Sequence, residues 1–247
     1  MDTTLIKGMR LFERLIHADA PLGVSALAVE LDLQKSNVHR TLATLVELGY
    51  AEQDPAGRYR PTRRIWEQGM KVIRRDPIRR ASISFMHALN AETQETISLA
   101  VLDGSDCLYL HQITTGTTIR PLATVGQRVP AVFPATGKTL LAYLPDVDKR
   151  VRAICAKRTN FGARKVSVPT LLEELAAIRK TGYAYSMNAW REGVHSVAGV
   201  VLGPGQEPFA AIGISGPAER LPKDRLKALS NSVLNACTQI GHALGAS

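Results

Sequence analysis

Residues 34–44 concentrate side chains that can hydrogen-bond to the edges of nucleic-acid bases. Asn37 has the amide geometry that pairs with adenine, and Arg40 has the guanidinium fork that pairs with guanine. Lys35 and Ser36 suit phosphate oxygens as well as base edges. The sequence therefore predicts contact with double-stranded DNA through one outward face, whose members are Gln34, Lys35, Ser36, Asn37, His39, Arg40 and Thr44.

The segment that must position these side chains is residues 22–49, LGVSALAVELDLQKSNVHRTLATLVELG, which predicts a helix-turn-helix. We expect Ser25 to be the N-cap of the first helix and Ser36 to cap the second. Asp32 and Leu33 form the turn between them. Apolar residues recur at helical spacing and are expected to face inward; they are Val38, Leu42, Leu45, Val46 and Leu48.

A β-hairpin is expected directly after this helix pair. Residues 50–53 and 58–60 read as short strands around an Asp-Pro-Ala-Gly turn at 54–57. Such a hairpin is a wing, and Arg58 and Arg60 would contact the flanking DNA backbone. The alternative interpretation is a three-helix subdomain with a solvated basic face.

Composition agrees with a polyanionic partner. The chain has 247 residues, a length that suits two domains, and 45% of them are apolar, which is enough for hydrophobic cores. The formal net charge is +9, and arginines and lysines gather between residues 58 and 80. Beside a winged helix, such a run is expected to add phosphate contacts.

Several kinds of chemistry are not expected. Cys107, Cys155 and Cys237 are too widely spaced for a disulfide framework or a structural zinc site, and the six histidines show no metal-binding spacing. We therefore expect no metal, no cofactor and no catalytic residues.

The first residues lack the apolar core of a signal peptide, and no apolar run is long enough to span a membrane. A cytoplasmic protein with no membrane partner is expected.

The remaining periodicity predicts an α+β chain with a mainly antiparallel sheet flanked by helices. Helices are expected at 4–17, 62–75, 78–94, 135–144, 169–183 and 222–244, and strands at 97–114 (two), 118–125, 193–205 and 208–217. These elements divide into a DNA-binding domain (1–61), a linker helix (62–77) and a larger domain (78–247).

Several blocks along the chain resemble the IclR family of transcriptional regulators. The helix-turn-helix and wing are similar to the family's DNA-binding part. VPAVFPATGKTLLAYLP (129–145), TGYAYSMNAWREGVHSVA (181–198) and AAIGISGPAERL (210–221) fall where the family's three effector-domain signatures fall. No block is specific alone, but together and in this order they are.

The resemblance implies a bacterial homodimer, or a dimer of dimers, that binds a pseudo-palindromic operator and acts as a repressor or an activator. It also implies a GAF-like C-terminal domain that binds a small effector, often a carboxylate or an aromatic catabolite. The family's pocket positions correspond here to Thr118, Pro121, Ala135, Thr136, Ser186, Ser196, Gly213 and Ser215. Some relatives carry an acid, a cysteine and a serine where Ser186, Ser196 and Gly213 stand, so no relative's ligand is transferred to this chain.

The residues themselves also indicate a pocket. A helix that begins near Thr136 offers unpaired N–H groups to a carboxylate, and Thr136, Ser196 and Ser215 can add hydroxyl donors. Trp190, Arg191 and His195 lie in a loop that could cover a ligand, with Arg191 as the counter-charge.

Ordinary structural roles remain open for the same residues. Thr136 could only cap its helix, Ser215 could bond to the backbone, and Arg191 could be solvated. Two other classes of protein are also open: an enzyme with an accessory DNA-binding domain, and an architectural DNA binder without a ligand.

Overall fold

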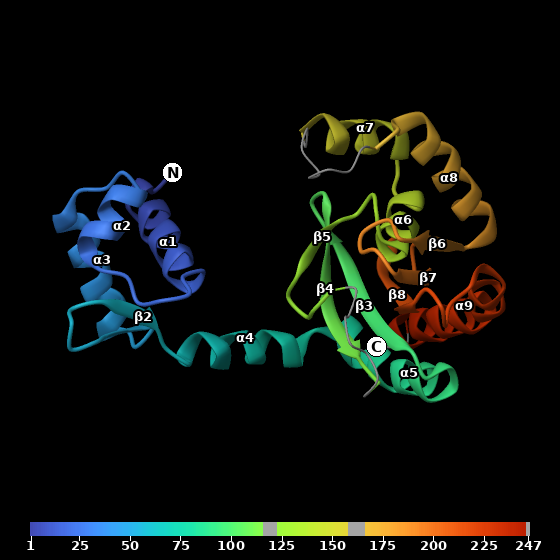
Figure 1. The fold of residues 1–247 in the computed structure, drawn as a ribbon, viewed down its shortest axis with the longest axis horizontal. Helices are drawn as coiled ribbons and strands as arrows, with labels where there is room; N and C mark the ends of the chain where they lie inside the picture. The colour runs from blue at the N-terminus through green and yellow to red at the C-terminus, as the bar shows by residue number, and fades with distance from the viewer. Residues whose placement is uncertain (116–122, 158–165, 246–247) are drawn as a thin grey trace. The chain divides into compact units, whose positions relative to one another are not determined.

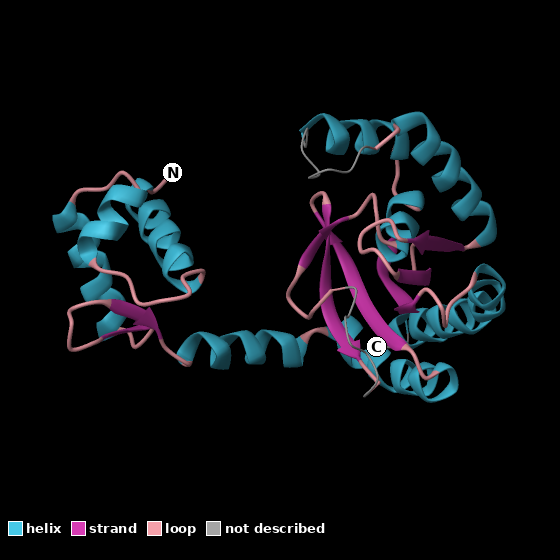
Figure 2. Cartoon of the chain, in the orientation of Figure 1, coloured by secondary structure: helices cyan, strands magenta, loops and turns pink. Residues whose placement is uncertain are grey.

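The computed structural model describes residues 1–115, 123–157 and 166–245. The chain divides into two compact units, Met1–Arg74 and Arg75–Ser247, and Figure 2 distinguishes their helices from their strands. Thr118, Pro121 and most of the strand expected at 118–125 lie outside the described residues. Within those residues, no helix is both long enough and apolar enough to cross a lipid bilayer.

The first unit is a winged helix-turn-helix, as the sequence predicted. Helices α1 (Thr3–Ile16), α2 (Val24–Glu30) and α3 (Lys35–Glu47) precede strands β1 (Ala51–Gln53) and β2 (Tyr59–Pro61), and α4 (Arg64–Arg75) follows. The two strands pair antiparallel. The core of this unit brings together one apolar face of α1, of α2 and of α3 with the wing: Leu11, Leu15, Leu27, Ala28, Val38, Leu42, Ala51 and Tyr59.

The expected helix caps and part of the expected inner face were wrong. The N-cap residues are Gly23 and Gln34, which have the extended backbone that this position requires, and neither makes a side-chain capping bond. Ser25 and Ser36 therefore lie inside their helices. Val46 and Leu48 are 39% and 51% exposed, whereas Val38 and Leu42 are buried and Leu45 packs against the same core.

The second unit is built on a six-stranded antiparallel sheet in the order β5-β4-β3-β8-β7-β6. The strands are β3 (Thr96–Asp103), β4 (Asp106–Ile113), β5 (Arg128–Pro130), β6 (Tyr183–Met187), β7 (Val194–Leu202) and β8 (Pro208–Pro217). The helices are α5 (Pro77–Thr93), α6 (Ala135–Ala142), α7 (Val147–Lys157), α8 (Val168–Thr181) and α9 (Lys223–Gly245).

Helices cover both faces of this sheet, so it has two hydrophobic cores. One core packs α5 and α9 against residues such as Ile97, Val197 and Ile212. The other packs α6 and α8 against residues such as Ala198 and Ala211. Because successive side chains along a strand point to opposite faces, each long strand contributes side chains to both cores. Figure 1 shows α5 beside α9, with α6 on the other side of the sheet.

Three elements were not expected from the sequence. Strand β5 has three residues, β6 is a five-residue edge strand, and α7 is rich in charged residues, so none of them forms a long apolar run in the sequence. The helix expected over 169–183 ends at Thr181, because Gly182 adopts a left-handed φ of 84° that terminates it. Tyr183 then begins β6.

Candidate functional site

The outward face of α3 is fully available to a partner. All seven side chains that the sequence singled out on it are exposed. The Arg40 guanidinium donates from Nη2 to Asn37 Oδ1 at 3.2 Å, which brings the two candidate base-reading groups together on one face. The opposite side of α3 is fixed in the core by Val38 and Leu42. The helix therefore presents polar side chains from a rigid support.

The wing presents two arginines. Arg58 forms an ion pair with Asp54 at 2.9 Å, and Arg60 forms one with Glu52 at 2.6 Å. Both arginine side chains are more than half exposed. A hydrogen bond from the Arg58 backbone N–H is the main reason that the pKa of Asp54 lies below its ordinary value. The ionised Asp54 thus holds the turn of the wing while Arg58 faces solvent.

In the second unit, two rows of small side chains cross the sheet beneath α6. One row pairs Ser196 with Ser215, and the other pairs Ala198 with Gly213. The absence of a side chain at Gly213 matters, because a Cβ there would lie 2.8 Å from Thr136 Cγ2. Small residues therefore let the first turn of α6 approach the sheet closely.

A small cavity lies at this close approach, between the first turn of α6 and the sheet. It has a volume of about 10 Å³, near the size that holds one water molecule. Five of its eight lining residues carry a hydroxyl group, and none carries a charge. The lining residues are Ser98, Tyr109, Ala135, Thr136, Ser196, Ala198, Gly213 and Ser215.

The polar groups of this cavity are hydrogen-bond donors and acceptors rather than acids or bases. The Tyr109 hydroxyl lies 3.1 Å from Thr136 Oγ1, and both residues are buried. Burial raises the pKa of the Tyr109 phenol, so it stays protonated. In the first turn of α6 the N–H groups of Gly137 and Lys138 donate to the Pro134 carbonyl, each at 3.0 Å, which leaves those of Ala135 and Thr136 with no acceptor within the helix. The arrangement suits recognition of a small polar group better than acid–base catalysis.

The structure brings together five of the residues that the sequence predicted for this site: Ala135, Thr136, Ser196, Gly213 and Ser215. Ser98 and Tyr109 were missed. Ser98 pairs in register with Gly213, so sheet register places it in the site. No local motif marks either residue, because their roles depend on β3 and β4 lying next to β8.

Ser186, Trp190, Arg191 and His195 do not line the cavity. Ser186 is buried and donates to the Phe133 carbonyl at 3.0 Å. The Trp190 ring stacks on the Phe133 ring, with centroids 5.8 Å apart. Both residues thus hold the segment that leads into α6.

His195 and Arg191 lie elsewhere. His195 alternates with Ser196, so its ring points to the other face of the sheet, where Nδ1 lies 2.9 Å from the Leu221 carbonyl oxygen. Arg191 is half-buried in the turn between β6 and β7, where its carbonyl accepts from the Val194 N–H.

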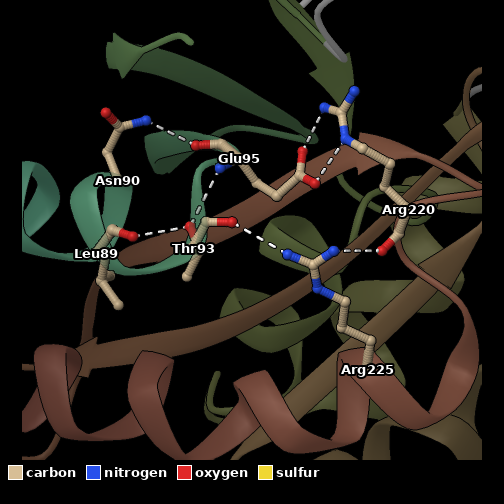
Figure 3. Close-up of polar contacts among 6 residues, drawn as sticks. All are labelled: Leu89, Asn90, Thr93, Glu95, Arg220 and Arg225. Carbon is tan, nitrogen blue, oxygen red and sulfur yellow. Dashed lines mark hydrogen bonds and ion pairs between the residues drawn. The ribbon is translucent and has the colours of Figure 1, made fainter. Parts of the chain in front are cut away.

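An ion pair between a buried carboxylate and a partly exposed guanidinium holds the end of β8 that follows Ser215 (Figure 3). Arg220 donates to both carboxylate oxygens of Glu95, at 2.9 and 2.7 Å. Arg225 donates to the carbonyls of Thr93 at 3.2 Å and of Arg220 at 2.9 Å. Gly216, the neighbour of Ser215, leaves the space that the Glu95 carboxylate fills. This network ties the C-terminal end of α5 to the strand that carries Ser215.

Among the described residues, no group of three or more His, Cys, Asp or Glu side chains could hold a metal ion.

Comparison with known proteins covers nearly the whole chain. A family model described as the IclR helix-turn-helix domain matches residues 4–55, and one described as bacterial transcriptional regulator IclR C-terminal matches residues 70–242. The HTH-type transcriptional regulator KipR of Bacillus subtilis (strain 168) is 27% identical over 243 residues, which cover 98% of this chain and 97% of that protein.

Solved structures share the fold. A crystal structure described as a transcriptional regulator from Rhodococcus sp. RHA1 aligns with a TM-score of 0.84 and 25% identity, over 100% of this chain and 99% of that chain. An IclR homologue from Microbacterium hydrocarbonoxydans, described in complex with 4-hydroxybenzoate, aligns with a TM-score of 0.79 and 22% identity, over 99% and 100% of the two chains.

Proposed function

This chain belongs to the IclR family and is a DNA-binding transcriptional regulator, and from that premise we propose that its larger domain senses a small carboxylate, aromatic or aliphatic. The effector would bind between the first turn of α6 and strands β7 and β8. Binding there would change the affinity of the regulator for its operator. The observation that carries this proposal is the cluster of hydroxyl groups on Thr136, Ser196 and Ser215, buried together in one cavity.

The effector site has the donors that a carboxylate needs. Hydroxyl groups and the first N–H groups of a helix all donate hydrogen bonds to an anion. The Microbacterium homologue described with 4-hydroxybenzoate supports an acid as the ligand class. Ser186 and Trp190 support the site from outside through their contacts with Phe133. Thr118 and Pro121, which lie outside the described residues, stay as proposed neighbours of the ligand.

On the operator, α3 would contact the bases and the wing would contact the DNA backbone. On this proposal Asn37 and Arg40 contact base edges in the major groove, while Arg58 and Arg60 contact phosphates. The exposure of these side chains and the rigid attachment of α3 to the core of the first unit support these roles. The proposed domains are residues 1–61 for DNA binding, 62–77 as a linker helix and 78–247 for effector binding.

We further propose that the regulator acts as a homodimer, or as a dimer of dimers. Large apolar side chains stand exposed on α1 and α4: Leu5 is 62% exposed, Met9 48%, Trp66 70% and Val72 72%. Apolar surface of this kind is typical of an interface between protomers. A dimer would place two recognition helices about 34 Å apart, one turn of the DNA helix.

The test is an electrophoretic mobility shift with a fragment of the regulator's own promoter, repeated with a panel of aliphatic and aromatic acids. We expect retardation of the fragment and a change in apparent Kd with at least one acid. The same acid should raise the melting temperature of the free protein. The double variant Thr136→Val/Ser215→Ala should keep operator binding and lose the response. A full-length protein that retards no promoter fragment, with or without acids, would contradict the proposal.

An architectural DNA binder without a ligand is the competing function. It predicts that no acid in the panel changes the melting temperature or the operator affinity. An enzymatic role is not supported, because the curated relatives are transcriptional regulators and repressors.

A further inference from the structure

We propose that Tyr109 sets the size of the effector, so that the site accepts compact aliphatic hydroxy acids and excludes aromatic acids. This inference rests on the proposed function and narrows its ligand class. It concerns one side chain on β4 that no motif in the sequence marks. Tyr109 is the large member of the cavity lining; the other seven lining residues are Ser, Thr, Ala or Gly.

The Tyr109 ring is held in place from three directions. Its side chain is 1% exposed and belongs to the core beneath α6. Its hydroxyl group lies 3.1 Å from Thr136 Oγ1. Its backbone N–H donates to the Gln127 carbonyl at 3.1 Å, and its own carbonyl accepts from the Gly126 N–H at 2.8 Å. Rotating the ring away would break the bond to Thr136 and disturb a close-packed core.

The rest of the sheet that lines the cavity offers little further room. Ser196, Ala198, Gly213 and Ser215 stand on two adjacent paired strands, and their side chains are already small. Space on that wall would open only if paired strands separated, which would break backbone hydrogen bonds. A ligand that does not shift α6 must therefore displace Tyr109 or fit beside it. A two- or three-carbon acid requires a much smaller displacement than a benzene ring.

The chemistry of the lining agrees with a compact hydroxy acid. The Tyr109 phenol stays protonated, since burial disfavours its charged form, and it can donate to a carboxylate. Hydroxyl groups from Ser98, Ser196 and Ser215 surround a volume of about 10 Å³. An aromatic ligand would place an apolar ring against these hydroxyls and leave buried polar groups unpaired, which is unfavourable.

The experiment compares wild type, Tyr109→Leu and Tyr109→Phe by the change in melting temperature and in operator affinity with each of four acids. The probes are glycolate and lactate, and benzoate and 4-hydroxybenzoate. We expect wild type to respond to glycolate or lactate and not to the benzoates. Tyr109→Leu removes ring volume and should gain a response to a benzoate. Tyr109→Phe keeps the ring, so this variant should still show no response to the benzoates.

A control separates the loss of core volume from the opening of the site. Leu110→Ala, on the same strand, removes volume from the core on the opposite face of the sheet. It should lower the melting temperature without admitting benzoates. Circular dichroism of each variant verifies folding. If Tyr109→Leu does not fold, the response of wild type to glycolate and lactate, compared with its response to the two benzoates, still tests the inference.

The possible outcomes distinguish this inference from the proposed function. Benzoates that act on wild type as strongly as glycolate and lactate would overturn the role of Tyr109 and leave an acid-sensing regulator standing. A folded Tyr109→Leu that responds no better to benzoates than Leu110→Ala would also overturn it. No response to any of the acids, in wild type or in any variant, would count against the proposed effector class and this inference together.

Discussion

Arg220 donates two hydrogen bonds to the carboxylate of Glu95, whose side chain is only 2% exposed. The two residues are far apart in the chain: Glu95 follows α5, and Arg220 lies between β8 and α9. Two hydrogen bonds between one guanidinium and one carboxylate are charge-assisted, and together they fix the orientation of the two groups relative to each other. The pair therefore fixes the end of β8, and Ser215 with it, relative to α5.

Breaking this pair should destabilise the fold. Arg220→Met leaves a buried carboxylate without its partner, and we expect the free energy of unfolding to fall by about 3 kcal/mol. That is the lower end of the cost for a buried pair, because the Arg220 side chain is 37% exposed. Urea denaturation at pH 7 measures the change. The exposed pair Arg128–Asp103 is the control: Asp103→Ala should cost less than about 1 kcal/mol.

The architecture was predictable where local pattern and burial agree. The helix-turn-helix and the wing follow from a helical period and an Asp-Pro-Ala-Gly turn within one short stretch. Strand β6 was not predictable in that way, because its stability comes from pairing with β7 at the sheet edge. The cap positions at Gly23 and Gln34 were missed because the fold, rather than a hydroxyl side chain, sets where those helices begin.

The site was only partly predictable for the same physical reason. Thr136 and Ser215 stand in blocks with a family pattern, so sequence was enough to nominate them. Tyr109 depends on β4 lying two strands away from β8, a relation that no local spacing encodes. His195 was expected in a loop over the ligand, but it stands on β7, where its ring faces away from Ser196.

Base recognition should depend on the hydrogen-bonded pair on α3. Asn37→Ala or Arg40→Ala is expected to weaken binding to the operator by about 1–3 kcal/mol and to relax the preference at one base pair. Fluorescence anisotropy at fixed salt, with the operator and with single-base variants of it, measures both effects. Glu13→Ala, an exposed change on α1, is the matched control. Unchanged affinity for every sequence would remove Asn37 and Arg40 from the base-reading set.

The wing should act through charge alone. Arg60→Ala is expected to weaken binding to all DNA sequences by a similar factor and to reduce the slope of log K against log salt by about 1. The measurement is a salt titration of affinity for the operator and for unrelated DNA. Because Arg60 pairs with Glu52, Glu52→Gln should have the opposite effect on affinity. A loss confined to the operator sequence would instead assign Arg60 to base reading.

Thiol chemistry gives a test of burial that is independent of function. Burial raises the pKa of Cys107 and of Cys237 to about 12. At pH 8 these buried thiols stay protonated, so they should resist iodoacetamide while Cys155, which is half-buried, reacts first. Mass spectrometry of timed samples identifies the labelled residue, and all three should react in guanidinium. Fast labelling of Cys107 in the native protein would contradict the packing beneath α6.

The same two thiols predict how stability depends on pH. Their folded-state pKa lies above the value of 9.0 for an exposed thiol, so the folded state keeps the protons that the unfolded state loses. Their contribution to the free energy of unfolding is therefore complete below about pH 9 and declines as the pH rises toward 12. Urea midpoints at pH 7.5 and 10 should show a fall that is smaller in Cys107→Ala/Cys237→Ala than in wild type. An equal fall in both proteins would assign the loss to other groups.

The close approach of α6 to β8 should be intolerant of even a methyl group. In Gly213→Ala the new Cβ would lie 2.8 Å from Thr136 Cγ2, so α6 must shift or the Thr136 side chain must rotate. Either change disrupts the bond between Thr136 and Tyr109, and we expect a loss of about 1–3 kcal/mol in stability with a loss of the response to acids. Operator binding without acids should survive, because the first unit keeps its own core.

Gly104→Ala, in the turn between β3 and β4, is the control: its Cβ meets no neighbour, although its φ of +65° adds backbone strain. It should therefore cost stability and leave the response intact. A Gly213→Ala protein that keeps both its melting temperature and its acid response would show that the packing between α6 and β8 does not shape the effector site.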